Sequence, residues 1–273
     1  MHIDILTLFP EMFESPLSHS IVKRAIERKK LSIEFIDFRE FTKDKHKQVD
    51  DYPFGGAPGM VIKPEPLFEA VDFLKNKRKY LLGSDEFPLI YLTPQGESYT
   101  QQIAEELSHK KYLAILCGHY KDVDYRVREH LVTREISIGN YVLSGGELPA
   151  MIIIDSLARL QEGVLSNMES AYSDSFQGNT LDGPYYTRPR EYRGYKVPEV
   201  LLSGNHKLIE EWQKSKRKKT YRKGERSFRC MIICLLDWFI TRFIIKTKRS
   251  LRLLSPILTY MISPEPFFWI TIP

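Results

Sequence analysis

Cysteine is scarce in this 273-residue chain, which contains three. So few thiols, and an odd number of them, exclude a disulfide framework and fit a reducing compartment, so we expect a cytoplasmic location. The amino-terminal HIDILTLFPEMFE has no basic region and no small-residue cleavage site, so the sequence predicts no secretory signal. With 42% hydrophobic and 27% charged residues, the composition is that of a globular protein and excludes wholesale disorder.

Long uncharged apolar runs are also lacking. The apolar stretch 231–245 is interrupted by Asp237 and Arg242, and it falls short of the roughly 20 residues that a membrane span needs. A buried helix, an interface helix and a membrane-surface helix remain open for it, and we expect no membrane partner. The GxGxxG and GxxxxGK[ST] phosphate-binding patterns are missing. Cys230 and Cys234 lack a second Cys/His pair, so no zinc site is predicted, and no Ser or Cys lies in a nucleophile elbow.

Negative charge is nearly missing from one segment. Residues 214–229 contain nine basic residues and one acidic residue, whereas residues 1–213 contain 26 basic and 32 acidic residues. An acidic body followed by a basic segment suggests a polyanionic partner. A solvated linker explains the same run equally well.

What the chain does contain is an alternation of two patterns. We expect strands in the β-branched apolar runs at 2–9, 31–38, 89–93, 112–118 and 135–143. We expect helices at about 16–29, 65–79, 100–109 and 149–161. This order predicts an α/β fold with a mainly parallel sheet that is covered on both faces. Residues 163–195 show no sustained period, so a linker or binding loop is expected there.

Small-residue loops follow three of the predicted strands, at Thr93–Gly96, Cys117–Tyr120 and Ser137–Met151. In parallel sheets, ligands bind at the carboxyl ends of the strands. If the three strands are neighbours, these loops form one pocket lined by backbone N–H and C=O groups. Such a pocket suits an adenine or a ribose better than a metal. For Ser137–Met151 alone, a strand–turn–helix with turn glycines is the simpler interpretation.

Three polar residues outside these loops have both a structural and a functional interpretation. Arg159 is four residues after Asp155 on a predicted helix, so it forms either a simple ion pair or a group that points into the pocket. Asp174 and Asp182 lie in the irregular 163–195 stretch, where most aspartates form turns.

Eight segments taken together resemble one family. They are LFPEMF (8–13), FGGAPGMV (54–61), TPQG (93–96), CGHY (117–120), SIGNYVLSGGELPAM (137–151), DSF (174–176), YYTRP (185–189) and VPEVLLSGNH (197–206). They are similar to segments of the bacterial tRNA (guanine-N1)-methyltransferases, the TrmD family of the SPOUT class. The resemblance covers about residues 1–215. It implies an S-adenosyl-L-methionine (AdoMet)-dependent enzyme that methylates N1 of the guanosine immediately 3′ of the tRNA anticodon, position 37.

The same resemblance implies a domain organisation. An AdoMet-binding α/β domain at 1–163 would end in a trefoil knot. A flexible linker at 164–195 would connect it to the start of a helical tRNA-binding domain at 196–227. The apolar tail 228–273 has no counterpart in the family. The enzyme would be a homodimer with its active site at the subunit interface.

The resemblance also implies roles for individual residues. Asp174 matches the general base, and Arg159 matches the arginine that stabilises charge on guanine O6. The implied cofactor-binding residues are Leu92, Thr93, Pro94, Gln95, Gly118, Ile138, Gly139, Asn140, Tyr141, Val142, Leu143, Gly145, Gly146 and Pro149. Those implied for tRNA binding are Asp182, Arg188, Asn205 and His206. A dependence on Mg²⁺ is implied as well, without a cluster of protein ligands to hold the ion.

The chain departs from the family pattern at Asn140, where the family usually has Asp, and at Lys121–Asp122. Asn140 lacks a charge near the cationic groups of the cofactor, so we expect weaker AdoMet binding and not a loss of activity. Two other functions stay open. The chain could be a SPOUT methyltransferase for another RNA, or a non-catalytic tRNA-binding protein because of its unusual carboxyl terminus.

Overall fold

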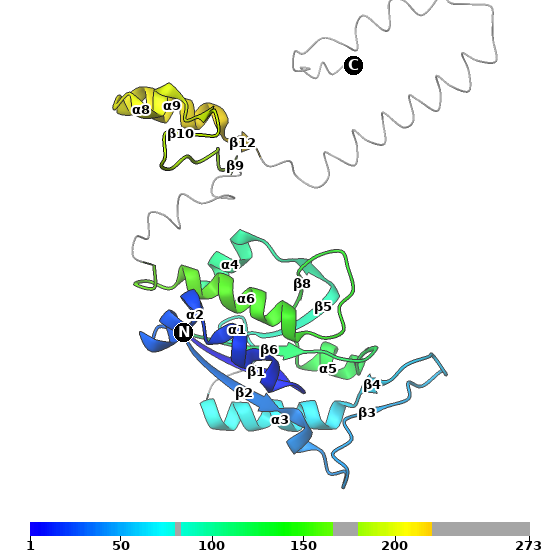
Figure 1. Cartoon of the computed structure of the whole chain (residues 1–273). Coiled ribbons are helices and arrows are strands. Elements are labelled where there is room, and N and C mark those ends of the chain that lie inside the picture. The colour runs from blue at the N-terminus through cyan, green and yellow to red at the C-terminus, as the bar shows by residue number, and fades with distance from the viewer. Residues whose placement is uncertain (80–82, 166–179, 220–273) are drawn as a thin grey trace, which may run out of the picture. The chain divides into compact units, whose positions relative to one another are not determined.

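The computed structural model describes residues 1–79, 83–165 and 180–219. Its centre is a five-stranded sheet with the strand order β2-β1-β6-β5-β8 (Figure 1). All four pairings between neighbouring strands are parallel. The strands are β1 (His2–Thr7), β2 (Ser32–Asp37), β5 (Leu89–Ser98), β6 (Tyr112–Cys117) and β8 (Arg134–Ser137). The predicted α/β fold with a parallel sheet is therefore confirmed.

Helices cover both faces of the sheet (Figure 1). On one face lie α2 (Ser20–Glu27), α4 (Gln101–Ser108) and α6 (Glu147–Leu160), together with the short η1 (Pro10–Phe13) and α1 (Glu14–Leu17). On the other lie α3 (Pro64–Arg78), α5 (Tyr125–His130) and η2 (Phe38–Phe41). Because both faces are covered, β6 is buried at every position, which explains its uninterrupted apolar sequence.

A small second sheet extends the body. It has the order β3-β4-β7 and consists of β3 (Asp50–Asp51), β4 (Val61–Ile62) and β7 (Asp122–Val123). Each of its strands has two residues, which is too short for an apolar alternation that would predict a strand from the sequence. The glycine-rich segment 54–60 connects β3 to β4.

The described part of the carboxyl-terminal region begins at residue 180 and consists of short elements. They are β9 (Thr180–Leu181), β10 (Glu191–Tyr192), β11 (Tyr195–Lys196), α8 (Glu199–Leu202), α9 (His206–Lys216) and β12 (Lys218–Lys219). Asn205 caps the amino terminus of α9, because its Oδ1 accepts a hydrogen bond from the Leu208 N–H at 3.3 Å.

Three predicted elements differ clearly in extent from the observed ones. The strand predicted at 89–93 continues to Ser98 in β5. The run 135–143 was expected to be one strand, but β8 ends at Ser137. There the Ser137 side chain replaces the strand ladder, since its Oγ donates to the Gly139 carbonyl at 3.0 Å and accepts from the Gly139 N–H at 3.3 Å. The helix expected at 16–29 is divided into α1 and α2, with Ser20 at φ 54°.

None of the helices among the described residues is both long and apolar enough to span a bilayer. The apolar stretch 231–245 lies outside the described residues.

Candidate active site

A cavity of about 340 Å³ opens at the carboxyl ends of β6, β5 and β8. These three strands are neighbours in the sheet, as the pocket predicted from their loops requires. The cavity is lined by Tyr91, Leu92, Thr93, Pro94, Gln95, Gly118, His119, Tyr120, Lys121, Asp122, Ile136, Ser137, Ile138, Gly139, Tyr141, Val142, Leu143, Ser144, Gly145, Gly146 and Pro149. A cavity of this size is in the range that holds a small organic ligand.

The first wall is a bulge in β5. Leu92 pairs with Ile136 of β8, and the next pairing residue, Glu97, meets the same Ile136. The residues between them, 93–96, therefore leave the ladder and turn towards the cavity. The base of this bulge packs on β8, where a Cβ atom at Gly96 would lie 2.5 Å from the Glu135 carbonyl carbon.

The second wall forms where the turn after β6 meets the segment before α6. The Gly146 N–H donates to the Gly118 carbonyl at 2.9 Å. A Cβ atom at Gly146 would lie 2.7 Å from Cys117 Cα, and one at Gly118 would lie 2.8 Å from the Tyr91 hydroxyl oxygen. Both positions therefore require glycine, because the backbones approach too closely for a side chain.

A buried carboxylate at the start of α6 connects this wall to β1. Glu147 is 2% exposed at the start of α6, and its Oε1 accepts a hydrogen bond from the Thr7 hydroxyl at 2.7 Å. Burial raises the pKa of the neighbouring Cys117 thiol well above its ordinary value, and the charge of Glu147 raises it further. Cys117 therefore stays a neutral thiol and is not a candidate nucleophile.

Nearly all the residues that the resemblance implied for the cofactor line this one cavity. Asn140 is the exception: it is exposed and is not among the lining residues. Sequence reasoning missed eight lining residues, namely Tyr91, His119, Tyr120, Lys121, Asp122, Ile136, Ser137 and Ser144. They belong to the same strand ends and loops as the predicted residues, so taking each loop as a whole would have found them.

The other predicted site residues do not line the cavity. Arg159 is exposed in the last turn of α6, ten residues after Pro149 and thus about 15 Å further along the helix. Asp174 lies outside the described residues. Of the four residues implied for tRNA, Asp182 is half-buried, whereas Arg188, Asn205 and His206 are exposed.

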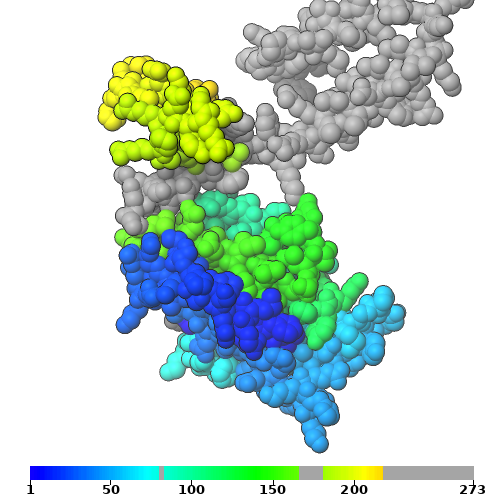
Figure 2. All heavy atoms as spheres, in the orientation of Figure 1, coloured from blue at the N-terminus to red at the C-terminus, as the bar shows by residue number. Residues whose placement is uncertain are grey.

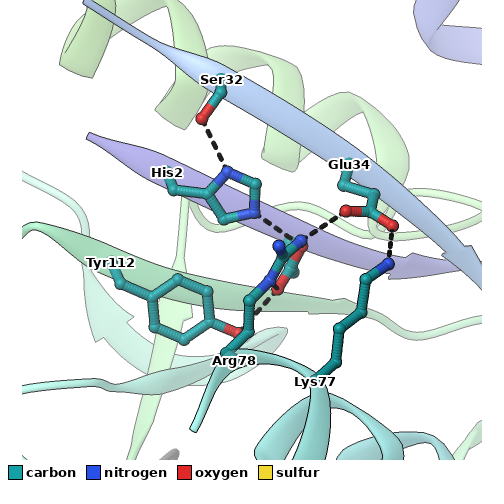
Figure 3. A network of polar contacts seen from close by, with 7 residues as sticks. His2, Ser32, Glu34, Lys77, Arg78 and Tyr112 are labelled. Carbon is teal, nitrogen blue, oxygen red and sulfur yellow. Dashed lines mark hydrogen bonds and ion pairs between the residues drawn. The ribbon is translucent and has the colours of Figure 1, made fainter. Parts of the chain in front are cut away.

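A second polar cluster lies at the amino ends of the strands, the edge opposite the cavity (Figure 3). Asp4, His2 and Glu34 bring possible metal ligands within 4.8 Å of one another. Arg78 occupies this position instead: its Nε and Nη2 donate to Asp4 at 3.0 and 2.7 Å, and Nη2 also donates to Glu34. A guanidinium among these carboxylates makes them an ion-pair network and a poor cation site.

The fold and the cavity define a class of protein. Adjacent parallel strands end in glycine-rich loops whose backbones close a cavity with few charged groups, an arrangement suited to a nucleoside-like ligand. At Gly118 and Gly146 the close approach of the backbones leaves no room for a side chain in the cavity wall. The chain is thus an α/β protein with a parallel sheet and a cavity at the carboxyl ends of three neighbouring strands.

Comparison with known proteins gives the particular family. The model of the tRNA (guanine-1)-methyltransferase TrmD family matches residues 1–227. A tRNA (guanine-N(1)-)-methyltransferase of Oceanobacillus iheyensis is 52% identical over 214 residues, which are 78% of this chain and 85% of that protein. One of Desulforamulus reducens is 55% identical over 214 residues, which are 78% of this chain and 83% of that protein.

A solved structure agrees with these matches. The crystal structure of the tRNA (m1G37) methyltransferase from Aquifex aeolicus has a TM-score of 0.63 and 43% sequence identity, and the match covers 78% of this chain and 87% of that one. The chain therefore belongs to the TrmD family of tRNA (guanine-N1)-methyltransferases. The methyl donor that this family implies is S-adenosyl-L-methionine.

Proposed function

We propose that this enzyme transfers the methyl group of AdoMet to N1 of guanosine 37 of tRNA, with Asp174 as general base and Arg159 as the residue that stabilises charge on guanine O6. The observation that carries the proposal is the glycine-lined cavity at the ends of β6, β5 and β8, in a chain that belongs to the TrmD family.

AdoMet fits this cavity for two reasons. Its adenine and ribose can pair with the backbone groups of the bulge 93–96 and of the turns at Gly118 and Gly139, which line the cavity. The closely packed glycines Gly145 and Gly146 add no side chain of their own to the opposite wall. When bound, AdoMet supplies an electrophilic methyl group on a sulfonium.

The chemistry explains why two further residues are needed. Guanine N1 carries a proton and is a poor nucleophile until that proton leaves. A carboxylate with an ordinary pKa of ~3.9 is a weak base for so weak an acid, so Asp174 needs assistance. The permanent charge and planar donors of Arg159 supply it by stabilising the negative charge that builds on O6. The cavity and the base together align N1 with the methyl carbon.

We place the active site between two subunits of a homodimer. Arg159 is about 15 Å along α6 from the cavity at which this helix begins, so it can serve a cavity only from another subunit. An exposed apolar surface supports this arrangement. Leu148 and Ile152 on α6 are each 48% exposed, and Met12 of η1, which packs beside α6, is 44% exposed. In Figure 2 the surface of the amino-terminal helices (blue) adjoins that of the α6 segment (green).

We also propose that the carboxyl-terminal part of the body forms a trefoil knot. After β8, at the edge of the sheet, the chain passes β5 and reaches the end of β6, where Gly146 bonds to Gly118 before α6 begins. Such a crossing over a neighbouring strand is what a threaded chain requires. We assign the knotted AdoMet domain to 1–163, an active-site linker to 164–195, the start of the tRNA-binding domain to 196–227, and an atypical tail to 228–273.

The tRNA would be bound by the part after the linker. We assign contacts with it to Asp182, Arg188, Asn205 and His206, assisted by the basic residues of 214–229. We place the reaction in the cytoplasm. The group formed by His2, Asp4 and Glu34 is occupied by Arg78, so any role of Mg²⁺ would be exerted through the substrates and not through an ion held there.

The test is methyl transfer from labelled AdoMet to unmodified tRNA with guanosine or adenosine at position 37. We expect incorporation in the guanosine tRNA alone, and its loss in Asp174→Ala with AdoMet binding retained. Incorporation in the adenosine tRNA, or full activity of Asp174→Ala, would contradict the proposed base and target.

A further inference from the structure

Arg128 of α5 binds three residues of the cavity wall and its support. Its Nε and Nη2 donate to Glu135 Oε1 and Oε2, both at 2.7 Å, and its Nη1 donates to Asp122 Oδ2 at 3.1 Å. Nη2 also donates to Gln95 Oε1 at 2.8 Å. The Arg128 side chain is 11% exposed, so this planar group is fixed in one orientation.

The same arginine is linked to the turn at Gly118. The Tyr91 hydroxyl donates to Asp122 Oδ1 at 2.7 Å, and the Arg128 guanidinium lies 5.7 Å from the centre of the Tyr91 ring. Burial raises the pKa of Tyr91, and the charge of Asp122 raises it further, so the hydroxyl keeps its proton and remains a donor. Tyr91 packs directly against Gly118. Arg128 therefore joins two walls of the cavity, the bulge with Gln95 and the turn with Gly118.

The contact with Arg128 determines which way the Gln95 amide faces. A guanidinium has donors and no acceptor, so the amide atom that it meets must be the oxygen. The Gln95 Nε2 is then turned away from Arg128. Among the described residues no protein acceptor meets this nitrogen, and Gln95 is an exposed residue that lines the cavity. Two N–H donors are thus left for a ligand.

We propose that Arg128 is a positioning residue: it holds Gln95 so that the amide NH₂ group donates to an oxygen acceptor of AdoMet. This inference rests on the proposed function, since it takes AdoMet as the ligand. It explains why a buried guanidinium with two carboxylate partners also contacts a neutral amide at the cavity.

The test is a double-mutant cycle on the full-length enzyme, with the dissociation constant of AdoMet measured by calorimetry. We expect Gln95→Met to weaken AdoMet binding about fivefold, the effect of one lost hydrogen bond, and Arg128→Met to weaken it by a similar factor. In the double variant we expect no further loss, because Arg128 acts through Gln95. In each variant we expect the KM for AdoMet to rise by a larger factor than the kcat falls, because the lost contact is one that binds the cofactor.

Arg126→Met is the matched control. Arg126 lies on the same helix, is 61% exposed and pairs with Asp124 at 2.8 Å, away from the cavity. It should leave AdoMet binding unchanged. Gln95→Met keeps the pairs of Arg128 with Asp122 and Glu135, so it tests the inference even if Arg128→Met unfolds.

The outcomes separate this inference from the proposed function. If the wild type binds AdoMet but Gln95→Met binds it equally well, or if the two losses add in the double variant, the positioning role is wrong and the proposed function stands. If the wild type binds no AdoMet, the proposed function is overturned and this inference with it.

Discussion

At the scale of single residues, the most completely enclosed ion pair of the described chain lies far from the cavity. Asp4 is fully buried, and it accepts hydrogen bonds from His2 Nε2 at 2.9 Å, from the Tyr112 hydroxyl at 2.7 Å and from Arg78 (Figure 3). Burial alone would raise the pKa of Asp4, but these hydrogen bonds outweigh it and lower the pKa from 3.8 to about 2. The network thus stabilises the ionised form of Asp4 and connects the amino ends of β1, β2 and β6.

This pKa leads to a prediction about acid stability. The pKa of Asp4 is lower in the folded state than in the unfolded state. Its contribution to the free energy of unfolding is therefore complete above about pH 4 and is lost as the pH falls towards 2. The shift corresponds to about 2 kcal/mol of unfolding free energy. We expect Asp4→Asn to be less stable than the wild type at pH 7. Between pH 5 and pH 2, we expect its free energy of unfolding to fall by about 2 kcal/mol less than that of the wild type.

Urea unfolding at several pH values measures both effects. Asp72→Asn is the control, since this residue is exposed on α3 and lies 3.8 Å from Lys75. Equal acid losses in the wild type and in Asp4→Asn would show that Asp4 does not have this role.

The helices and strands of the body differ in how well they can be predicted from the sequence. The strands β1, β2 and β6 and the long helices α3 and α6 carry a clear apolar pattern, and their predicted ranges agree with the observed ones to within two residues. The β3-β4-β7 sheet and the four-residue bulge in β5 are set by contacts with distant segments, so no local pattern predicts them. The same bulge turns Gln95 towards the cavity.

The exposed face of α6 gives a prediction at this scale. Ile152 is 48% exposed, and we place it in the dimer interface. We expect Ile152→Asp to weaken the dimer at least about a hundredfold, since a buried unpaired charge costs several kcal/mol, and to abolish methyl transfer.

Light scattering across a concentration series measures the dimer, and methyl transfer is assayed in parallel. Phe73→Asp is the control, because Phe73 is 42% exposed on α3, which covers the other face of the sheet. A stable, active dimer of Ile152→Asp would place the interface elsewhere.

For the whole molecule, we place the cavity of one subunit together with Arg159 and Asp174 of the other subunit in one active site. This arrangement predicts complementation between two inactive variants. Gly146→Val fills the cavity wall, where even a Cβ atom would lie 2.7 Å from Cys117 Cα. Asp174→Ala lacks the base. In a mixed dimer, one site has both the intact cavity and the intact base.

We expect the two variants, inactive alone, to regain about a quarter of the wild-type activity after mixing and subunit exchange, since half the dimers are mixed and each has one intact site. Methyl transfer before and after exchange measures this. If the mixture stays inactive although mixed dimers form, Asp174 serves the cavity of its own subunit.

The sequence alone determined the fold class, the strand ends that carry the loops, and the family, because these depend on apolar periodicity and on motifs that are contiguous in the chain. Only the tertiary structure decided that β6, β5 and β8 are neighbours, that Gly146 bonds to Gly118, and that Arg128 donates a hydrogen bond to Gln95. Gly146 and Gly118 are 28 positions apart, and Arg128 and Gln95 are 33 apart. Such contacts arise from the packing of separate elements, and no local pattern of residues contains them.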